Sequence, residues 1–379
     1  MPSNRLDVLI VGGGIGGLTA AVALRKAGCD VQVLERAEEV SAVGAGIALQ
    51  TNAMMALERI GVAEDISAAG VHIRSGRISS WSGSVLTELN FSDAPVLGVG
   101  IHRADLQRIL FIHAGHENVR TGAAVAGYRL VGDRVIAVLE SGDEVAGDLL
   151  VGADGIHSTV RAQHLGGGSP RYSGYTCWRG VTPHADQFER GQVFEIWGVG
   201  KRFGGLHVDE RLYWFAPVNV TADGRDEPGQ TTTALLALYE DWPERVRVTI
   251  AATPESAIIR NDIVDRPFRQ DWGRGRMTLL GDAAHPMTPD MGQGACQAIE
   301  DAVVLGRCMT EIDDPVAALR RYELERVART RRFVARSRMF GKIAQWENPM
   351  ARCLRDRIVR TTPQSIVCRD MLRTLRFPG

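Results

Sequence analysis

The sequence lacks the features that mark several specialised classes of protein. Its six cysteines are scattered, with no CxxC or CxxH spacing. This argues against a structural zinc or disulfide scaffold and suits a reducing compartment, so we expect a cytoplasmic protein without a metal site. The formal net charge is only -1, so there is no electrostatic case for nucleic acid as a partner.

Uninterrupted apolar runs are also scarce. Residues 8–24 carry no charge, but five glycines break the run and Arg25 and Lys26 follow it without a small-residue cleavage site. We therefore expect neither a signal peptide nor stable membrane insertion. No repeat or low-complexity tract is present, and 379 residues with 45% hydrophobic content predict one large domain or two intimately mixed ones.

A glycine-rich segment near the start predicts a dinucleotide site. The apolar run 6–11 predicts a buried parallel strand, and Gly12, Gly14 and Gly17 then form G-x-G-x-x-G ahead of an Ala/Leu-rich helix over 18–27. Glu35 ends the next strand, 30–34, at the distance where an acid binds ribose hydroxyls. A turn without a ligand is the plain alternative, and NAD or the AMP half of FAD fits equally well.

Two later segments have the same layout of a strand followed by a polar loop. Residues 276–280 predict a strand, Gly281-Asp282 ends it, and Pro286 and Pro289 keep the next residues out of a helix until Gly292-Gln293-Gly294 begins one. Exposed amides at such a helix start stabilise partial negative charge, as on the pyrimidine side of a reduced flavin. Strand 148–151 leads to Asp154 and Ser158, which have the simpler explanation that they cap the next helix.

Together these motifs resemble those of the single-component FAD-dependent aromatic hydroxylases, group A flavoprotein monooxygenases, and most of all the salicylate-hydroxylase and urate-hydroxylase-like branch. The matching elements are the first glycine motif with Glu35, D-G-x-H-S-x-V-R at 154–161, and G-D-A-A-H-P-x-x-P-x-x-G-Q-G at 281–294. The resemblance implies tightly bound FAD, transient NADH or NADPH, and O2. It implies hydroxylation of a small aromatic or heteroaromatic substrate through a flavin C4a-hydroperoxide.

The resemblance also assigns cofactor contacts. The phosphate and ribose contacts would be Gly12, Gly14, Gly17, Glu35, Arg103, Asp154 and Asp282, with Arg36 either solvated or near the adenine. The contacts to the isoalloxazine would be the amides of Gly294 and Ala295 on one side and Gly46 on the other.

Catalytic roles follow from the same branch. Arg202 would hold an anionic ring or carboxylate, Asp290 would act as general base or position a water, and Tyr213 would lie at the substrate. Each has a plain alternative: a solvated strand-end charge, a turn residue and a core aromatic. We favour a loop-forming role for His285, and His207 is a weaker candidate base.

The expected fold is α/β, with a Rossmann-like parallel FAD-binding sheet, an inserted, mainly antiparallel substrate-binding sheet and C-terminal helices. The FAD-binding domain would comprise 1–70, 98–165 and 276–340, the substrate sheet 71–97 and 166–275, and a helical segment 341–379. Alternation predicts antiparallel strands at 193–197, 211–215 and 246–250. The arginine-rich helix from 315 to 340 should present a solvated outer face.

Three other functions are alternatives to hydroxylation. A flavin halogenase is disfavoured because no W-x-W-x-I-P segment occurs. A reductase or desaturase without oxygenation, and a non-enzymatic flavin protein that shelters an intermediate, both fit the motifs. The chain would be a monomer or homodimer.

Overall fold

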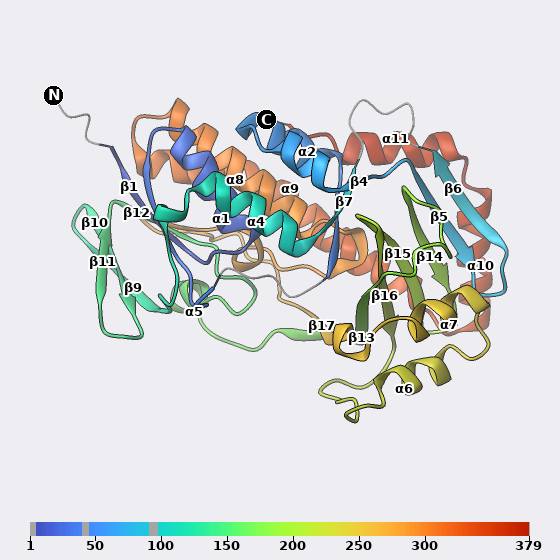
Figure 1. Cartoon of the computed structure of the whole chain (residues 1–379). Helices are drawn as coiled ribbons and strands as arrows, with labels where there is room; N and C mark the ends of the chain where they lie inside the picture. Colours follow the sequence, from blue (N-terminus) through green and yellow to red (C-terminus); the bar gives the residue numbers. More distant parts are fainter. Residues whose placement is uncertain (1–4, 40–44, 91–97, 379) are drawn as a thin grey trace.

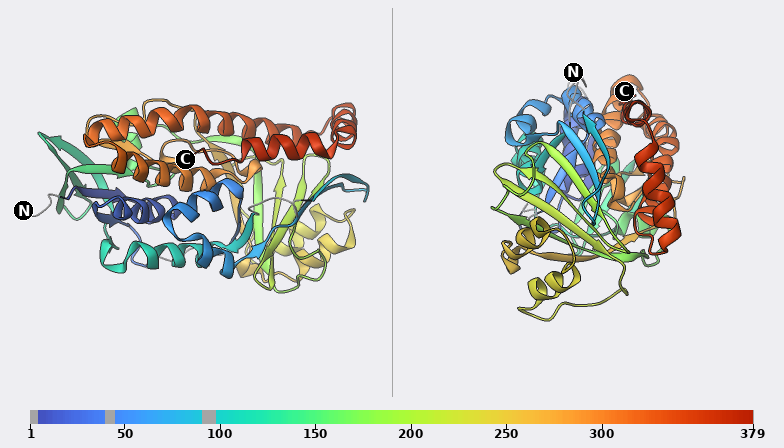
Figure 2. Two further views of the ribbon diagram at one scale, coloured as in Figure 1. Left: turned by 90° about the horizontal axis from the view of Figure 1, so that it is seen from above. Right: turned by 90° about the vertical axis from the view of Figure 1, so that its right-hand side faces the viewer.

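The computed structural model describes residues 5–39, 45–90 and 98–378. The molecule is elongated, with a parallel sheet in one half and a large, mainly antiparallel sheet in the other (Figure 1). Helices α8 and α9 lie along the long axis, and α9 reaches from one half to the other (Figure 2). The predicted α/β class is confirmed.

The first half is built on a five-stranded sheet in which all neighbours are parallel. Its order is β18 (Met277–Leu279), β12 (Leu149–Gly152), β1 (Asp7–Val11), β2 (Asp30–Leu34) and β8 (Val119–Arg120). Its helices are α1 (Ile15–Lys26), α2 (Thr51–Ile60), α3 (Ala63–Ala69), α4 (Arg103–Ala114), α5 (Thr159–Leu165) and α8 (Gly294–Glu311). The central strands are buried almost throughout, as their continuous apolar runs predict.

Two small antiparallel sheets complete this half. One contains β11 (Glu144–Gly147), β10 (Arg134–Leu139) and β9 (Val125–Val131). The other contains β3 (Gly46–Leu49), β7 (Val99–His102) and β4 (Val71–His72), and it lies toward the second half. Short 3-10 turns are η1 (His116–Asn118), η2 (Glu255–Ala257), η3 (Gly281–Ala283) and η4 (Pro289–Met291).

The second half is a seven-stranded sheet, antiparallel except for one parallel pair, β14 with β5. Its order is β17 (Ile259–Asp265), β13 (Arg171–Thr182), β16 (Arg211–Val218), β15 (Arg202–Val208), β14 (Gln192–Trp197), β5 (Ser75–Ser80) and β6 (Val85–Asn90). The inserted, mainly antiparallel sheet is thus confirmed. The division into domains at the residue numbers expected above stays a prediction.

Residues alternate between the two faces of this sheet. Trp214 and Phe203 point to the outer face, where they pack with Tyr239 and with helices α6 (Thr231–Leu238) and α7 (Glu244–Ala251). Tyr213 and Leu206 point to the inner face and pack near Ala45 and Ala48 of the first half. The expected strand at 246–250 is wrong, because these residues lie in α7 and Val246 and Ile250, one turn apart, both fill the outer core.

The C-terminal part contains α9 (Pro315–Ala344), α10 (Pro349–Thr361) and α11 (Gln364–Thr374). The solvated-face prediction for α9 is wrong at Arg326, whose side chain is buried against Glu300 and Asp301, whereas Arg331 and Arg332 are exposed. No helix within the described part of the chain is long and apolar enough to cross a membrane.

Candidate active site

The three motifs meet at one edge of the parallel sheet. Strands β1, β12 and β18 end side by side, with Val11 opposite Gly152 and Gly152 opposite Leu279. The segments that follow them are the first glycine loop, the Asp154 loop and the Gly281 loop. Ligands of open parallel sheets bind beyond the carboxyl ends of the strands, so this edge is the place for a dinucleotide.

The three glycines of the first motif have distinct structural reasons. Gly12 has φ +105°, and a Cβ there would lie 2.6 Å from the Ala153 carbonyl oxygen. A Cβ on Gly17 would lie 1.9 Å from the Gly12 oxygen, so only glycine allows the helix to pack this closely on the loop. A Cβ on Gly14 would meet no atom of the described residues within 4 Å, which leaves this side of the loop open for a pyrophosphate.

Two helices point their N-termini at this edge. A Cβ on Gly16 of α1 would lie 3.3 Å from the Ala298 Cβ of α8, and a Cβ on Gly306 would lie 3.0 Å from the Ala23 Cβ. The helices are therefore parallel and nearly in contact. Neither helix has a side-chain N-cap or an acidic residue in its first turn. The positive ends of both macrodipoles are thus available to an anion, including at the Gly294 and Ala295 amides.

Acidic residues flank the same edge. Glu35 accepts hydrogen bonds from the Gly13 amide at 2.5 Å and the Ala37 amide at 2.9 Å, which hold its carboxylate beside the glycine loop. Asp282 lies next to Gly294, where a Cβ would be 3.9 Å from its Oδ1. Asp282 is exposed, yet desolvation by the surrounding protein raises its pKa, against the opposing effects of His285 and Arg103. Arg103 and Arg36 are both exposed.

Asp154 has a structural role and one unexplained atom. Its Oδ2 accepts from the Thr159 and Val160 amides at the start of α5, so the capping interpretation holds. Its Oδ1 is buried and has no hydrogen-bond partner in the part of the chain that the structure describes, and burial raises the pKa of the carboxyl against its hydrogen bonds. An orphaned buried oxygen beside an open glycine loop and two uncapped helices fits a ligand that is rich in hydrogen-bond donors and phosphate, as FAD is.

The predicted catalytic pair is in contact. Arg202 Nη2 donates to Asp290 Oδ1 at 2.6 Å, and the Tyr175 hydroxyl donates to Asp290 Oδ2 at 2.6 Å. The two side chains of the ion pair are only 2% and 1% exposed. The pair joins η4, in the loop after Gly281, to β15 of the seven-stranded sheet.

Further partners fix Arg202. Its Nε donates to Gln345 Oε1 at 3.0 Å, and Glu195 Oε2 lies 3.4 Å from Nη1. Burial opposes its charge, but Glu195 and Asp290 outweigh burial and raise its pKa. Arg202 is therefore a permanent cation. Desolvation, reinforced by Asp290, raises the pKa of Tyr175, which keeps its proton as a donor.

Tyr213 lies elsewhere on the same inner face. A Cβ on Gly46 would lie 2.4 Å from the Tyr213 ring, so Gly46 provides the close approach between β3 and the sheet. Burial raises the pKa of Tyr213 to about 12, against the nearby Arg179 guanidinium. The pairing of Arg179 with Phe215 and of Val181 with Tyr213 puts these four side chains on one face.

The two histidines take structural positions. His285 is fully buried, with Nε2 2.5 Å from Asp301 Oδ2, which ties the loop after Gly281 to α8. This agrees with the loop-forming role that the sequence favours. His207 pairs with Leu212, on the face opposite Tyr213, and its ring contacts the Ala185 carbonyl. His207 therefore points away from the inner face.

Sequence reasoning missed the residues that hold these parts together. Arg161 Nη1 donates to the Ala283 and Ala284 carbonyls, which joins α5 to the loop after Gly281. Arg326 binds Asp301, Glu300 and the Gln297 side chain from α9. Arg161 is the last residue of the motif at 154–161, so the sequence could have indicated its role. No local sequence pattern around Gln345 or Arg326 indicates that they contact the site.

The chain belongs to the FAD binding domain family, whose model matches residues 5–337. FAD is accordingly its cofactor, and the chain is an oxidoreductase of the flavoprotein monooxygenase class.

Individual proteins resemble it over nearly the whole chain. Aurachin C monooxygenase/isomerase of Stigmatella aurantiaca is 46% identical over 378 residues, 98% of each chain. The crystal structure of Klebsiella pneumoniae HpxO complexed with FAD and uric acid is similar with a TM-score of 0.92 and 31% identity, covering 98% of this chain and 96% of that one. Zeaxanthin epoxidase of Solanum lycopersicum is 40% identical over 362 residues, but the alignment spans only about half (53%) of its length.

Proposed function

We propose that this chain hydroxylates a small aromatic or heteroaromatic compound, with NADH or NADPH as electron donor and O2 as oxygen source. The observation that carries the proposal is the junction between the loop after Gly281 and the inner face of the seven-stranded sheet, fixed by the Arg202–Asp290 pair. A flavin ring held by the loop would meet a substrate held by the sheet. When bound, FAD supplies the redox chemistry that carries electrons to O2.

The inner face of the seven-stranded sheet carries side chains that can bind an aromatic substrate. Tyr213, Phe215 and Val181 provide apolar and aromatic surface next to strand β3. Arg179 is a cation close enough to Tyr213 to oppose the rise of its pKa, and it is only partly buried, unlike Arg202. We assign Arg179 to an anionic or hydrogen-bonding substituent of the substrate, and Tyr213 to the side of its ring.

Arg202 and Asp290 would act at the junction. Both carboxylate oxygens of Asp290 are already bonded, one by Arg202 and one by Tyr175. Asp290 would therefore receive a substrate proton through Tyr175 or after the ion pair opens, and Arg202 would keep the carboxylate in place.

The function is tested with purified FAD-containing protein. Hydroxybenzoates, salicylate, urate, quinolones and aurachin C are screened for stimulation of NAD(P)H oxidation, with peroxide measured to judge coupling. The last compound is included because of the near full-length relative. Oxygen from labelled O2 should appear in the product. Turnover without label would identify a reductase or desaturase, and no stimulation by any compound would favour a non-enzymatic flavin protein.

The substrate role of Arg179 has a matched control. Arg179→Gln should raise KM about tenfold with a smaller effect on kcat, because a charge-assisted hydrogen bond is lost. Arg260 lies on the adjacent strand, with its guanidinium 5.2 Å from the ring of Trp178 on the opposite face. Arg260→Gln should leave both constants near wild type, and equal effects of the two changes would contradict the assignment.

A further inference from the structure

Helix α10 turns an apolar stripe toward solvent. Met350, Leu354 and Ile358 follow one another at intervals of four residues, so they lie along one side of the helix. Their exposed fractions are 80%, 57% and 54%. A helix on the surface of a globular protein normally buries such a stripe, so this one has an unusual orientation.

The orientation is fixed from the inner side of the helix. Arg355 is buried, its guanidinium lies 5.0 Å from the Trp197 ring centroid, and its Nη1 donates to the Ala344 carbonyl at 2.9 Å. Asn348 caps the helix by accepting from the Met350 and Ala351 amides. Rolling the helix to bury the stripe would remove Arg355 from these contacts.

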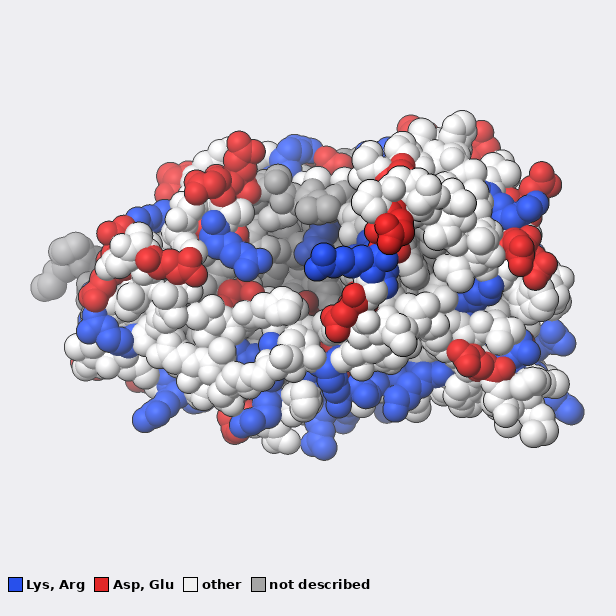
Figure 3. Space-filling view, turned by 90° about the horizontal axis from the view of Figure 1, so that it is seen from below, with Lys and Arg blue, Asp and Glu red and all other residues white. Residues whose placement is uncertain are grey.

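The segment that contains α10 and α11 is strongly basic. Residues 349–376 contain seven arginines and two aspartates, a net charge of +5 in a chain whose total is -1. By contrast, both signs are interspersed over much of the face in Figure 3. Asp356 and Asp370 already pair with Arg355 and Arg336.

Several of these arginines have no acidic partner within the described part of the chain. Among the residues that the structure describes, no ion pair engages Arg357, Arg360, Arg369 or Arg373, and all four are exposed. Their charges are therefore available to a partner outside the chain.

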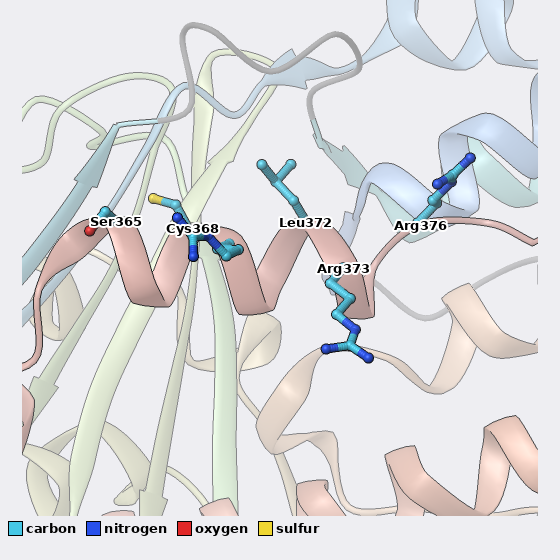
Figure 4. A pocket seen from close by; sticks show the side chains of 6 residues that line it. Ser365, Cys368, Leu372, Arg373 and Arg376 are labelled. Carbon is cyan, nitrogen blue, oxygen red and sulfur yellow. The ribbon is translucent and has the colours of Figure 1, made fainter.

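Helix α11 adds a shallow hollow. Its volume is about 590 Å3, and it is lined by Ser365, Cys368, Arg369, Leu372, Arg373 and Arg376. Figure 4 shows Leu372 and Arg373 on opposite sides of α11, with Arg376 just beyond the end of the helix. Guanidinium groups bind phosphate through paired hydrogen bonds, while the leucine offers contact to a hydrocarbon chain.

We propose that α10 and α11 form a peripheral docking surface for a membrane that contains anionic phospholipid. Apolar residues flanked by arginines on a surface helix are the pattern of helices that lie at the lipid headgroup level. A second copy of the chain fits less well, because a two-fold interface would bring the same unpaired arginines face to face. The helices lie at the end of the molecule that carries the seven-stranded sheet (Figure 1).

The test is flotation of the FAD-containing protein with vesicles. Vesicles of phosphatidylcholine alone are compared with an equimolar mixture with phosphatidylglycerol, and the anionic vesicles should bind at least about tenfold more protein. The triple variant Met350→Ser, Leu354→Ser, Ile358→Ser should lose about tenfold of this binding. Arg369→Gln with Arg373→Gln should also lose about tenfold or more, and added salt should weaken the wild type.

A matched control removes three exposed apolar side chains elsewhere. Ile112, Val131 and Leu324 are exposed to a similar degree, and their triple serine variant should bind anionic vesicles like the wild type. Flavin content and the rate of flavin reduction by NAD(P)H show whether each variant is folded. If the α10 triple variant does not fold, the variant Arg369→Gln with Arg373→Gln on α11 still tests the proposal.

Three results would overturn the proposal. The wild type would bind neutral and anionic vesicles equally weakly, or the control would lose as much binding as the α10 variant. Alternatively, light scattering would show that the wild type is a dimer and that the α10 triple variant is a monomer. This would identify the surface as a contact between copies. Loss of vesicle binding with intact activity keeps this question separate from the proposed function.

Discussion

Replacing Arg326 by methionine tests how the loop after Gly281 is held. The Arg326 side chain is 1% exposed and binds Asp301 through Nε at 2.6 Å, Glu300 through Nη1 and Gln297 Oε1 through Nη2 at 2.7 Å. Asp301 in turn accepts from the Gly281 amide and contacts His285. The change removes the buried cation and leaves two buried carboxylates beside the loop.

The expected loss in free energy of unfolding depends on the ion pairs that remain after the substitution. Removing one partner of a buried ion pair destabilises a protein by about 3–5 kcal/mol. Glu300 keeps Arg329, whose Nε lies 2.6 Å from it, so we expect the lower end, about 3 kcal/mol. Arg329→Met is the matched control. Arg329 is partly exposed and Glu300 keeps Arg326 in that variant, so about 1 kcal/mol should be lost.

The pH dependence gives a second readout. Burial disfavours the charge of Asp301, but His285 and Arg326 outweigh it and lower its pKa from 3.8 to about 2. A lowered carboxyl pKa contributes stability that is complete above the ordinary pKa and is lost as pH falls through the folded one. The difference between wild type and Arg326→Met should therefore be largest above pH 4 and shrink toward pH 2.

Urea unfolding of the FAD-saturated proteins, followed by tryptophan fluorescence and flavin release, measures these differences. The reasoning is refuted if Arg326→Met costs no more free energy of unfolding than Arg329→Met. It is also refuted if the difference between wild type and variant grows as the pH is lowered.

Three further predictions concern the cofactor and the junction. Gly17→Ala should give little folded protein, because its Cβ would lie 1.9 Å from the Gly12 oxygen, whereas Gly14→Ala should fold and bind FAD weakly, because its methyl group enters the open side of the loop. Circular dichroism and flavin absorbance separate the two, and equal behaviour would contradict the roles given to these glycines. Glu35→Ala should weaken FAD binding about tenfold to a hundredfold through loss of charge-assisted hydrogen bonds, and titration calorimetry that finds unchanged affinity would exclude that contact. Asp290→Asn should slow substrate hydroxylation about a hundredfold, and wild-type rates at every pH would remove Asp290 as the base.

The sequence predicted the strands and turns that form this edge of the parallel sheet, because the motifs are local. Each consists of a strand, a turn and a helix start within about 20 residues, and a parallel sheet then brings strand ends together without further information. Gly12, Asp154 and Asp282 thus follow adjacent strands in the structure. Their roles toward FAD remain proposals.

The wrong predictions concern residues whose structure depends on contacts with residues far away in the sequence. Residues 246–250 have strand-forming composition, but the outer face of the seven-stranded sheet receives Val246 and Ile250 as one side of a helix. Arg326 was expected in solvent because the carboxylates that bind it lie about 25 residues earlier on another helix. Likewise, no local pattern predicts that Gln345 hydrogen-bonds Arg202 from 143 residues away.

The order of strands in the parallel sheet has a consequence for synthesis on the ribosome. Strand β1 is made first, but its neighbour β12 ends at Gly152, and β18, beyond β12, ends only at Leu279. All seven strands of the other sheet lie between Ser75 and Asp265, so that sheet has every strand available before β18 emerges. Until β18 is synthesised, the nascent parallel sheet lacks that strand and leaves apolar surface of β12 exposed, which favours aggregation and binding by chaperones.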